Sequence, residues 1–429
     1  MNQIKSPVKL VFRAGLLLFL AAALVLPQAA LAQRSSNKSE EAEPAFPLTE
    51  RSEPSIRTGS RIQRQIGEMF DAYNEDQLDK VQSMANDLLS NAKAGDYAHA
   101  MANRLLAEVA NERDEVAVAI DHLNKAIAAN ALPNEQHFLS MVLLAQLLGF
   151  EEREDEAVEV MKRFLEESGS RDPQYRMVYA QSLYRLERYD EAAKEITDVL
   201  AQAEEADPNW KKLLLAVYVE ADRVPDAIAI AEDLRAGDPD DKALIVNLAS
   251  LYLDTDQVDK AVALLEDGKQ RGLFVAEEDY ERLYRLYYNM EGQEAKTIAV
   301  ITEGLEKGIL KPGHQVYNLL GQVYYFSDQT PQAIEAWVKA VEFAPDGRTA
   351  LNLARVYYNE ERYAEAKAAI NQALSQGLEQ PADGYVTLGN IELYGLQNKS
   401  AAAAAYREAL KHPGSHQEQA QKGLAAANR

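Results

Sequence analysis

From about residue 62 to the C-terminus, apolar residues recur at intervals of three and four positions. Around Trp337, for example, they stand at i, i+3, i+4 and i+7, which is the spacing that lines one face of an α-helix. Nowhere do apolar and polar residues alternate over a run long enough for a β-strand. The pattern therefore predicts an all-α protein built from amphipathic helices.

A small residue recurs once in nearly every predicted pair of helices. It opens the second helix of each pair, at Ala119, Ala157, Ala192, Ala227, Ala261, Thr297, Ala333, Ala366 and Ala402, about 35 residues apart on average. A weaker unit at 62–95 puts Lys80 in this place. Because small side chains let two helices joined by a short turn approach closely, the spacing predicts stacked helix pairs.

The segment from Tyr317 to Pro345 carries the fullest copy of the repeat. It reads aromatic-x2-Leu-Gly-x2-Tyr, then Ala-x3-aromatic, then Pro, and it resembles the tetratricopeptide-repeat (TPR) superfamily at every spacing. The resemblance implies a right-handed superhelix, or TPR solenoid, of about nine to ten helix-turn-helix repeats over residues 61–414. Ser415 and Glu418 have capping-box spacing, which predicts a C-terminal capping helix and tail at 415–429.

Prolines mark the boundaries of the predicted repeats. Of the ten prolines in the repeat region, eight lie where one unit ends and the next begins, while Pro225 and Pro331 lie at the start of a second helix. The missing N–H costs nothing there. None lies inside a predicted helix, where a proline would cost about 3 kcal/mol.

The N-terminus has the layout of a secretory signal peptide. Three basic residues precede an apolar run from Ala14 to Leu26, and Ala30-Leu31-Ala32 provides small residues for a signal peptidase. An uncleaved membrane anchor is the alternative, but the run has 13 residues and a bilayer needs about 20. We therefore expect a signal peptide at 1–32, cleavage after Ala32, and a periplasmic protein without stable membrane insertion.

A leader at 33–60, rich in Pro, Ser and Glu, separates the signal peptide from the repeats. Its prolines interrupt any helix, and its composition predicts a flexible segment. One apolar island, Phe46-Pro47-Leu48, allows two interpretations. The composition favours a solvated linker, and the alternative is a docking peptide for a partner or for the protein's own body.

The composition excludes several classes of function. The 429 residues include 68 Asp and Glu against 45 Lys and Arg, which gives a formal net charge of −23, and the chain has no Cys. The negative charge repels phosphate backbones and argues against nucleic-acid binding. Without cysteine, the chain has no disulfide framework, thiolate metal site or cysteine nucleophile.

No catalytic or cofactor-binding motif occurs in the sequence. The six histidines are scattered and none forms a His-Glu-x-x-His pair. The phosphate-binding patterns Gly-x-x-x-x-Gly-Lys-Ser/Thr and Gly-x-Gly-x-x-Gly are absent, as is the nucleophile elbow Gly-x-Ser-x-Gly. We therefore expect no enzyme activity, no cofactor and no metal site.

The remaining candidate for function is a surface. In TPR arrays the first helices line a concave face that binds peptides or partner helices, and Tyr and Arg carry much of the binding energy at interfaces. Residues 280–406 hold 13 of the 21 tyrosines. The resemblance thus implies a partner-binding groove lined by Tyr280, Tyr287, Asn318, Gln322, Tyr325, Phe326, Arg348, Arg355 and Tyr358.

Together these features predict a scaffold or adaptor for a protein or peptide partner in the cell envelope. The layout is similar to that of periplasmic TPR proteins that accompany TonB–ExbB–ExbD systems, which implies a role in energy transduction for outer-membrane uptake. An envelope-biogenesis adaptor, for outer-membrane assembly, polysaccharide export or cell-wall synthesis, is an open alternative. An anionic small-ligand binder or enzyme using Arg348 and Arg355 on the concave face is an alternative of another class.

Overall fold

The computed structural model describes residues 44–56, 58–412, 414 and 416–429. Within these residues the chain forms α-helices, one π-helical turn and connecting turns, without any β-strand. The predicted all-α class is confirmed for this part of the chain. The predicted signal peptide and the leader up to residue 43 lie outside the described residues. None of the helices described combines the length and apolarity needed to cross a membrane.

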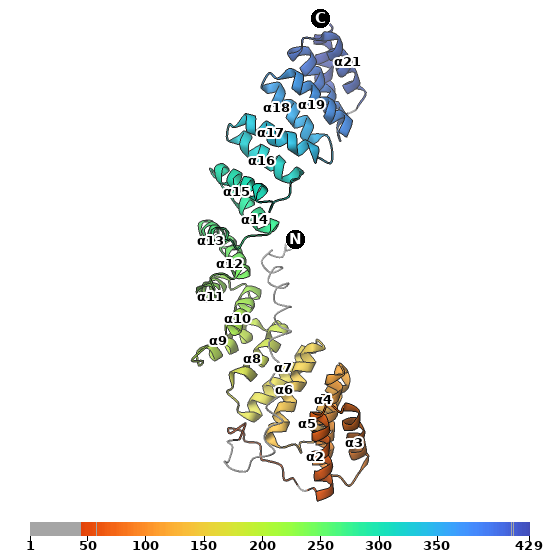
Figure 1. Cartoon of the computed structure of the whole chain (residues 1–429), viewed down its shortest axis with the longest axis vertical. Coiled ribbons are helices and arrows are strands. Elements are labelled where there is room, and N and C mark those ends of the chain that lie inside the picture. Colours follow the sequence, from red (N-terminus) through yellow and green to blue (C-terminus); the bar gives the residue numbers. More distant parts are fainter. Residues whose placement is uncertain (1–43, 57, 413, 415) are drawn as a thin grey trace. The chain divides into compact units, whose positions relative to one another are not determined.

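The chain divides into two compact units, of which unit 1 ends at Val258 and unit 2 begins at Asp259. The described part of unit 1 contains α2 (Ser60–Asn74), α3 (Leu78–Ser90), α4 (Asp96–Glu112), α5 (Val116–Ala128), α6 (Asn134–Phe150), α7 (Glu154–Ser168), α8 (Pro173–Arg185), α9 (Tyr189–Leu200), α10 (Pro208–Glu220), α11 (Val224–Gly237) and α12 (Lys242–Asp254). Consecutive helices form pairs such as α4–α5 and α6–α7, and each pair stacks on the next (Figure 1).

Unit 2 continues the same arrangement. It contains α13 (Val258–Gln270), which begins at the boundary, then α14 (Glu277–Tyr288), α15 (Glu294–Glu306), α16 (His314–Phe326), α17 (Thr330–Glu342), α18 (Arg348–Asn359), α19 (Tyr363–Gln376), α20 (Pro381–Asn390), the π-helical turn η2 (Ile391–Gly395), α21 (Lys399–Leu410) and α22 (Gln417–Ala427). The pairs from α14–α15 to α20–α21 stack in order (Figure 1). The predicted capping helix is present as α22, which packs on α21, while Ser415 lies outside the described residues.

The turn inside each pair has the same backbone conformation in repeat after repeat. Asp114, Glu152, Asp328 and Glu361, each two residues before a second helix, have φ between 56° and 58°. A single left-handed residue ends a helix and reverses the chain in a short distance. The two helices of a pair therefore stay adjacent, as their packing requires.

An Asp-Pro sequence starts each of α8 and α10, which are the first helices of their pairs. The Asp172 carboxylate accepts a hydrogen bond from the amide of Gln174 at 2.8 Å, and Asp207 accepts one from the amide of Asn209 at 2.8 Å. The proline that follows each Asp is the first helical residue, where its fixed φ favours the helix. Among the prolines whose placement is described, none lies beyond the first turn of a helix, as predicted.

The small residues that define the repeat are all buried at helix contacts. Each of the nine, from Ala119 to Ala402, is 0% exposed. A Cβ added to their partner Gly321 would lie 2.6 Å from the Trp337 ring, which shows how closely α16 and α17 approach. The predicted register is confirmed for these repeats. In the unit at 62–95 it is shifted by one residue, because Val81 is the buried residue and Lys80 is exposed.

Part of the leader is packed against unit 1. Phe46 is 5% exposed and belongs to a hydrophobic cluster with Phe138 and Phe164. The interpretation of the island as a solvated linker is therefore wrong, and docking on the protein's own body is what the structure shows. Composition favoured the linker because it cannot reveal the aromatic residues that α6 and α7 bring together.

Candidate partner-binding surface

The C-terminal end of α16 exposes two neighbouring aromatic side chains. Tyr325 is 39% exposed and Phe326 is 70% exposed, whereas Val323 in the same turn is buried. Successive side chains of an α-helix are about 100° apart, so one end of the helix presents residues to both the core and the solvent. Large apolar side chains exposed together are typical of interaction surfaces.

Tyr288 at the end of α14 extends this exposed area. It is 40% exposed, and its hydroxyl donates a hydrogen bond to Oε1 of Gln322 on α16 at 3.3 Å. A cavity of about 90 Å³ lies between α14, α15 and α16 and is lined by Tyr287, Tyr288, Met290, Glu294, Thr297, Val323 and Phe326. We call Tyr288, Met290, Gln322, Tyr325 and Phe326 the aromatic surface.

The second helix of the pair holds Tyr325 in place. The Tyr325 ring centroid lies 5.6 Å from that of Trp337 on α17, and Trp337 itself is 7% exposed. Trp337 can pack so close to α16 because Gly321 has no side chain there. The glycine and tryptophan of the repeat pattern thus position an exposed tyrosine on a rigid support.

A second group of aromatic residues lies on the next pairs of unit 2. Tyr358 on α18 packs edge-on against Tyr363 on α19, with centroids 5.7 Å apart, and Tyr394 in η2 is 59% exposed. Gly389 contacts the Tyr406 ring as Gly321 contacts Trp337, but one extra residue separates it from the second helix. The π-helical turn accommodates this extra residue, and such turns often occur at functional sites.

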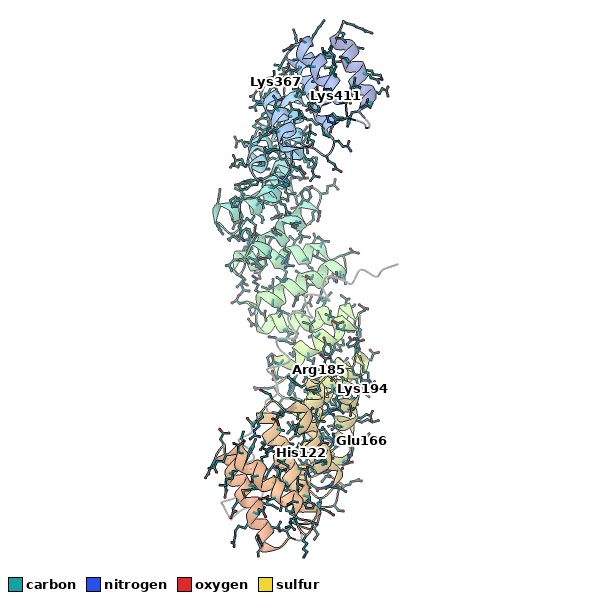
Figure 2. All side chains as sticks on the ribbon, turned by 90° about the vertical axis from the view of Figure 1, so that its right-hand side faces the viewer. His122, Glu166, Arg185, Lys194, Lys367 and Lys411 are labelled. Carbon is teal, nitrogen blue, oxygen red and sulfur yellow. The ribbon has the colours of Figure 1, made fainter. Side chains whose placement is uncertain are left out.

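An ion pair between a buried carboxylate and a partly exposed lysine ties η2 to α19. Glu392 is 3% exposed, and its Oε1 lies 2.7 Å from Nζ of Lys367, a side chain labelled in Figure 2. The other carboxylate oxygen of Glu392 has no hydrogen-bond partner. Lys367 therefore supplies the cation that compensates this buried charge in η2.

Acidic side chains follow the helices that carry these aromatic residues. They are exposed in the turns after α14, α16 and α18, at Glu291, Asp328, Glu360 and Glu361. Arg362 in the last of these turns is paired with Glu365 at 3.0 Å, so it does not offset them. A surface with this excess of negative charge attracts cationic partners.

Two of the predicted groove residues are buried instead. Tyr280 is 2% and Tyr287 is 1% exposed, and their hydroxyls are satisfied by carboxylates on neighbouring helices. Tyr280 donates to Glu303 at 3.1 Å and Tyr287 donates to Glu266. Burial and the bond to Glu266 raise the pKa of Tyr287. The placement of these two tyrosines on a groove surface was wrong.

Five further predicted residues differ in their exposure to solvent. Asn318 and Gln322 on α16 and Tyr358 on α18 are half-buried, while Arg348 and Arg355 on α18 are exposed. Nε of Arg348 lies 3.0 Å from Asp346, and Arg355 donates to Asp383 at 2.5 Å. Each guanidinium thus already has a carboxylate from its own chain. Within the described residues, no group of His, Asp and Glu gathers as a metal site.

Sequence reasoning missed Tyr288 and Tyr394. Tyr288 directly follows Tyr287, and choosing between them requires the rotation of α14, which a degenerate repeat does not reveal. Tyr394 lies after the extra residue of η2. The signal available was the interval of thirteen residues from Gly389 to Ala402, where other pairs have twelve.

Comparisons with known proteins agree with the repeat architecture. Family models described as "Tetratricopeptide repeat" match residues 142–209, 218–273 and 347–376. No curated protein sequence matches the chain.

Several solved structures are similar to parts of the chain. The APC/C hetero-tetramer Cut9-Hcn1 has 14% identity, covers 86% of this chain and 85% of its own, and has a TM-score of 0.27. A tetratricopeptide repeat protein from Parabacteroides merdae has 14% identity, covers 68% and 99%, and scores 0.28. YrrB, described as a TPR protein with an unusual peptide-binding site, has 18% identity, covers 46% and 95%, and scores 0.34.

The matched segments contain helices of the stacked pairs that the structure describes. Residues 142–209 include α7, α8 and α9, and residues 347–376 include the α18–α19 pair. Small residues are buried at the helix contacts in both segments. These segments of the chain therefore contain tetratricopeptide repeats.

Proposed function

We propose that this protein is a non-enzymatic interaction scaffold whose partner docks on the aromatic surface of unit 2. The observation that carries the proposal is the exposure of Tyr325 and Phe326 beside a cavity of about 90 Å³. Exposed aromatic side chains on a rigid support contribute binding area at a low cost in conformational entropy, and the cavity offers a place for one apolar side chain of the partner.

The chemistry of the surface suggests the kind of partner segment. The acidic turns at Glu291, Asp328, Glu360 and Glu361 favour basic residues, which would also speed association at low salt. The aromatic side chains and the cavity favour one aliphatic or aromatic anchor. The partner we propose is thus a peptide or helix with an apolar anchor flanked by Lys or Arg.

For location, we propose the periplasm, on the basis of the predicted signal peptide at 1–32. The leader and the acidic repeat array support a role beside a TonB–ExbB–ExbD system, in energy transduction for outer-membrane uptake. An adaptor for envelope biogenesis is the alternative with the same surface. The anion-binding alternative has less support, because Arg348 and Arg355 are paired with carboxylates of the chain itself.

The decisive experiment compares two phenylalanines. Phe326→Ala should weaken capture of crosslinked envelope partners by about tenfold, the size typical of a central interface residue. Phe150→Ala is the matched control, since Phe150 is 74% exposed at the end of α6 in unit 1 and the same atoms are removed. Partners crosslinked in intact cells are identified and quantified by mass spectrometry.

Two results would contradict the proposal. If Phe326→Ala retains the same partners in the same amounts, the aromatic surface is not the docking site. If cell fractionation finds the mature chain in the cytoplasm with its first 32 residues attached, the proposed location is wrong.

A further inference from the structure

The docked part of the leader has a defined local structure. Residues 46–49 form a turn in which the amide of Thr49 donates to the carbonyl of Phe46 at 3.4 Å. Pro47 stands second in this turn, the position for which its fixed φ is suited. The amide of Arg51 then donates to Oγ1 of Thr49 at 3.1 Å. The segment is therefore pre-shaped by its own sequence.

The turn inserts Phe46 into a socket of three aromatic rings. The Phe46 centroid lies 5.0 Å from Phe138 on α6, 5.9 Å from Phe164 on α7 and 5.9 Å from Tyr175 on α8. The contacts with both phenylalanines are edge-on, which is a favoured geometry for aromatic pairs. Two successive helix pairs of unit 1 thus contribute to one socket.

Polar groups fix the direction of the segment along the helix ends. The hydroxyl of Thr49 donates to the carbonyl of Glu167 near the end of α7 at 2.8 Å. The Arg51 guanidinium donates to Oδ1 of Asn130 at 3.0 Å and to the carbonyl of Leu132 at 3.0 Å. These acceptors lie at the end of one helix and in the loop between two others, so they recognise a peptide of one polarity.

The segment also supplies hydrogen-bond acceptors at the N-terminus of α6. The side-chain amide of Asn134 donates to the carbonyl of Arg51 at 3.0 Å, and its backbone amide donates to the Glu53 carboxylate at 3.2 Å. Asn134 is the first residue of α6, whose own N-cap, Pro133, supplies no side-chain acceptor. A carboxylate at this end is favoured by the helix dipole.

The receptor side leaves space for the peptide backbone. Gly169, which ends α7 with φ +63°, is so close to the leader that an added Cβ would lie 2.9 Å from the carbonyl oxygen of Leu48. Most of the bound side chains remain outside, since Pro47, Leu48, Ser52 and Glu53 are exposed. Recognition therefore rests on Phe46, Thr49 and Arg51, together with the Glu53 carboxylate at the start of α6.

From this geometry we infer that the edge formed by the ends of α5 to α8 is a peptide-binding site and that the leader is its ligand in cis. The site takes a segment that begins with a turn, in which an aromatic residue is followed by Pro, with a hydroxyl residue three positions after the aromatic and Arg five positions after it. It lies in unit 1 and does not depend on the aromatic surface of unit 2. Because the leader is covalently attached, it competes with free peptides at a high effective concentration.

The test uses a dye-labelled synthetic peptide of residues 44–53 and the full chain. Phe46→Ala in the chain removes the cis anchor and vacates the socket, so the labelled peptide should bind this variant at least about tenfold more tightly than the wild-type chain. A peptide carrying Phe46→Ala is the control and should not bind either chain. Fluorescence anisotropy gives the affinities, and circular dichroism verifies that the variant is folded.

If the labelled peptide binds neither chain, or binds both equally, the inference fails. A second pair of variants keeps it testable should Phe46→Ala not fold. Gly169→Ala places a Cβ against the leader, whereas Gly272→Ala shares the positive φ, +75°, but has no neighbour within 4 Å. Faster amide exchange at residues 46–53 in Gly169→Ala alone supports the site, and equal exchange in both variants overturns it.

Discussion

His137 on α6 has an imidazole ring that is buried without a hydrogen bond. It is 0% exposed, and neither ring nitrogen has a hydrogen-bond partner. Its Nε2 lies 3.8 Å from Oε2 of Glu167, which is too far for one. Burial, assisted by the nearby Arg51 guanidinium, lowers the pKa of His137 to about 4. The folded protein therefore favours the neutral imidazole.

This burial predicts a pH dependence at the scale of one residue. An unfolded histidine has a pKa near 6.5, so between about pH 6.5 and pH 4 the unfolded state binds more protons and stability falls as pH falls. The His137→Phe variant has no titratable side chain at this position, so it lacks this contribution to the pH dependence. Between about pH 7 and pH 4 the wild type should lose about 1–3 kcal/mol more than the variant, measured by urea unfolding at each pH. Parallel curves would contradict the assignment.

At the scale of the element, the contact of α16 with α17 shows how a helix pair is specified. Ala333 is 0% exposed and Ile334 is 6% exposed against α16, and the Trp337 ring fills the space that Gly321 leaves. Protein interiors are packed so densely that they leave no room for an added side chain. The same arrangement recurs where Gly389 meets Tyr406.

Enlarging the small residue should therefore weaken the pair. Ala333→Leu should lower the free energy of unfolding by about 1–3 kcal/mol, because the extra atoms overpack the contact. Ala299→Leu, at an exposed position of α15, is the matched control and should change stability by less than about 0.5 kcal/mol. Denaturant titration gives both values. A small effect of Ala333→Leu would mean that the repeat register is wrong.

The π-helical turn η2 gives a second prediction for an element. Lys367→Met leaves the buried Glu392 carboxylate without its cation and should destabilise the protein by about 1–3 kcal/mol, less than a fully buried pair because Lys367 is partly exposed. Adding Glu392→Gln to Lys367→Met should restore part of this loss. A double-mutant cycle measures the coupling, and additive effects would show that the ion pair contributes nothing to η2.

At the scale of the whole molecule, the chain consists of two compact units. Unit 2 has hydrophobic clusters of its own, one around Trp337 and Ile370 and another around Tyr406. Its last helix, α22, covers Tyr406 and carries exposed polar residues on its other side. Arrays of repeats are stabilised by contacts between neighbours, with polar terminal units that close the core.

Residues 259–429 should therefore fold alone. We expect a helical circular dichroism spectrum and a cooperative thermal transition for this fragment. Deleting residues 416–429 from it should lower the melting temperature, since α22 covers part of the core. An unstructured fragment would show that unit 2 needs unit 1 for folding.

Much of the architecture was predictable, and Gln322, Tyr325 and Phe326 of the aromatic surface were among the predicted groove residues, but the other parts of the candidate surfaces were not predicted. The buried positions of Ala119 and Ala402 follow from their spacing, because each repeat applies the same packing rule locally. The repeat spacing could not show which of Tyr287 and Tyr288 is exposed, since a shift of one residue turns a side chain from the core to the solvent. The docking of Phe46 on the protein's own body was predicted only as the alternative to a solvated linker, because its socket combines residues more than ninety positions away.

The sequence by itself determined the all-α class, the repeat and the positions where prolines separate successive repeats, because helical periodicity, small residues and prolines act over a few neighbouring residues. Only the tertiary structure decided which aromatic residues are exposed, that the arginines of α18 are already paired, and that the leader fills a socket on unit 1. Those features depend on contacts between distant segments, whose geometry is created only when the helices pack.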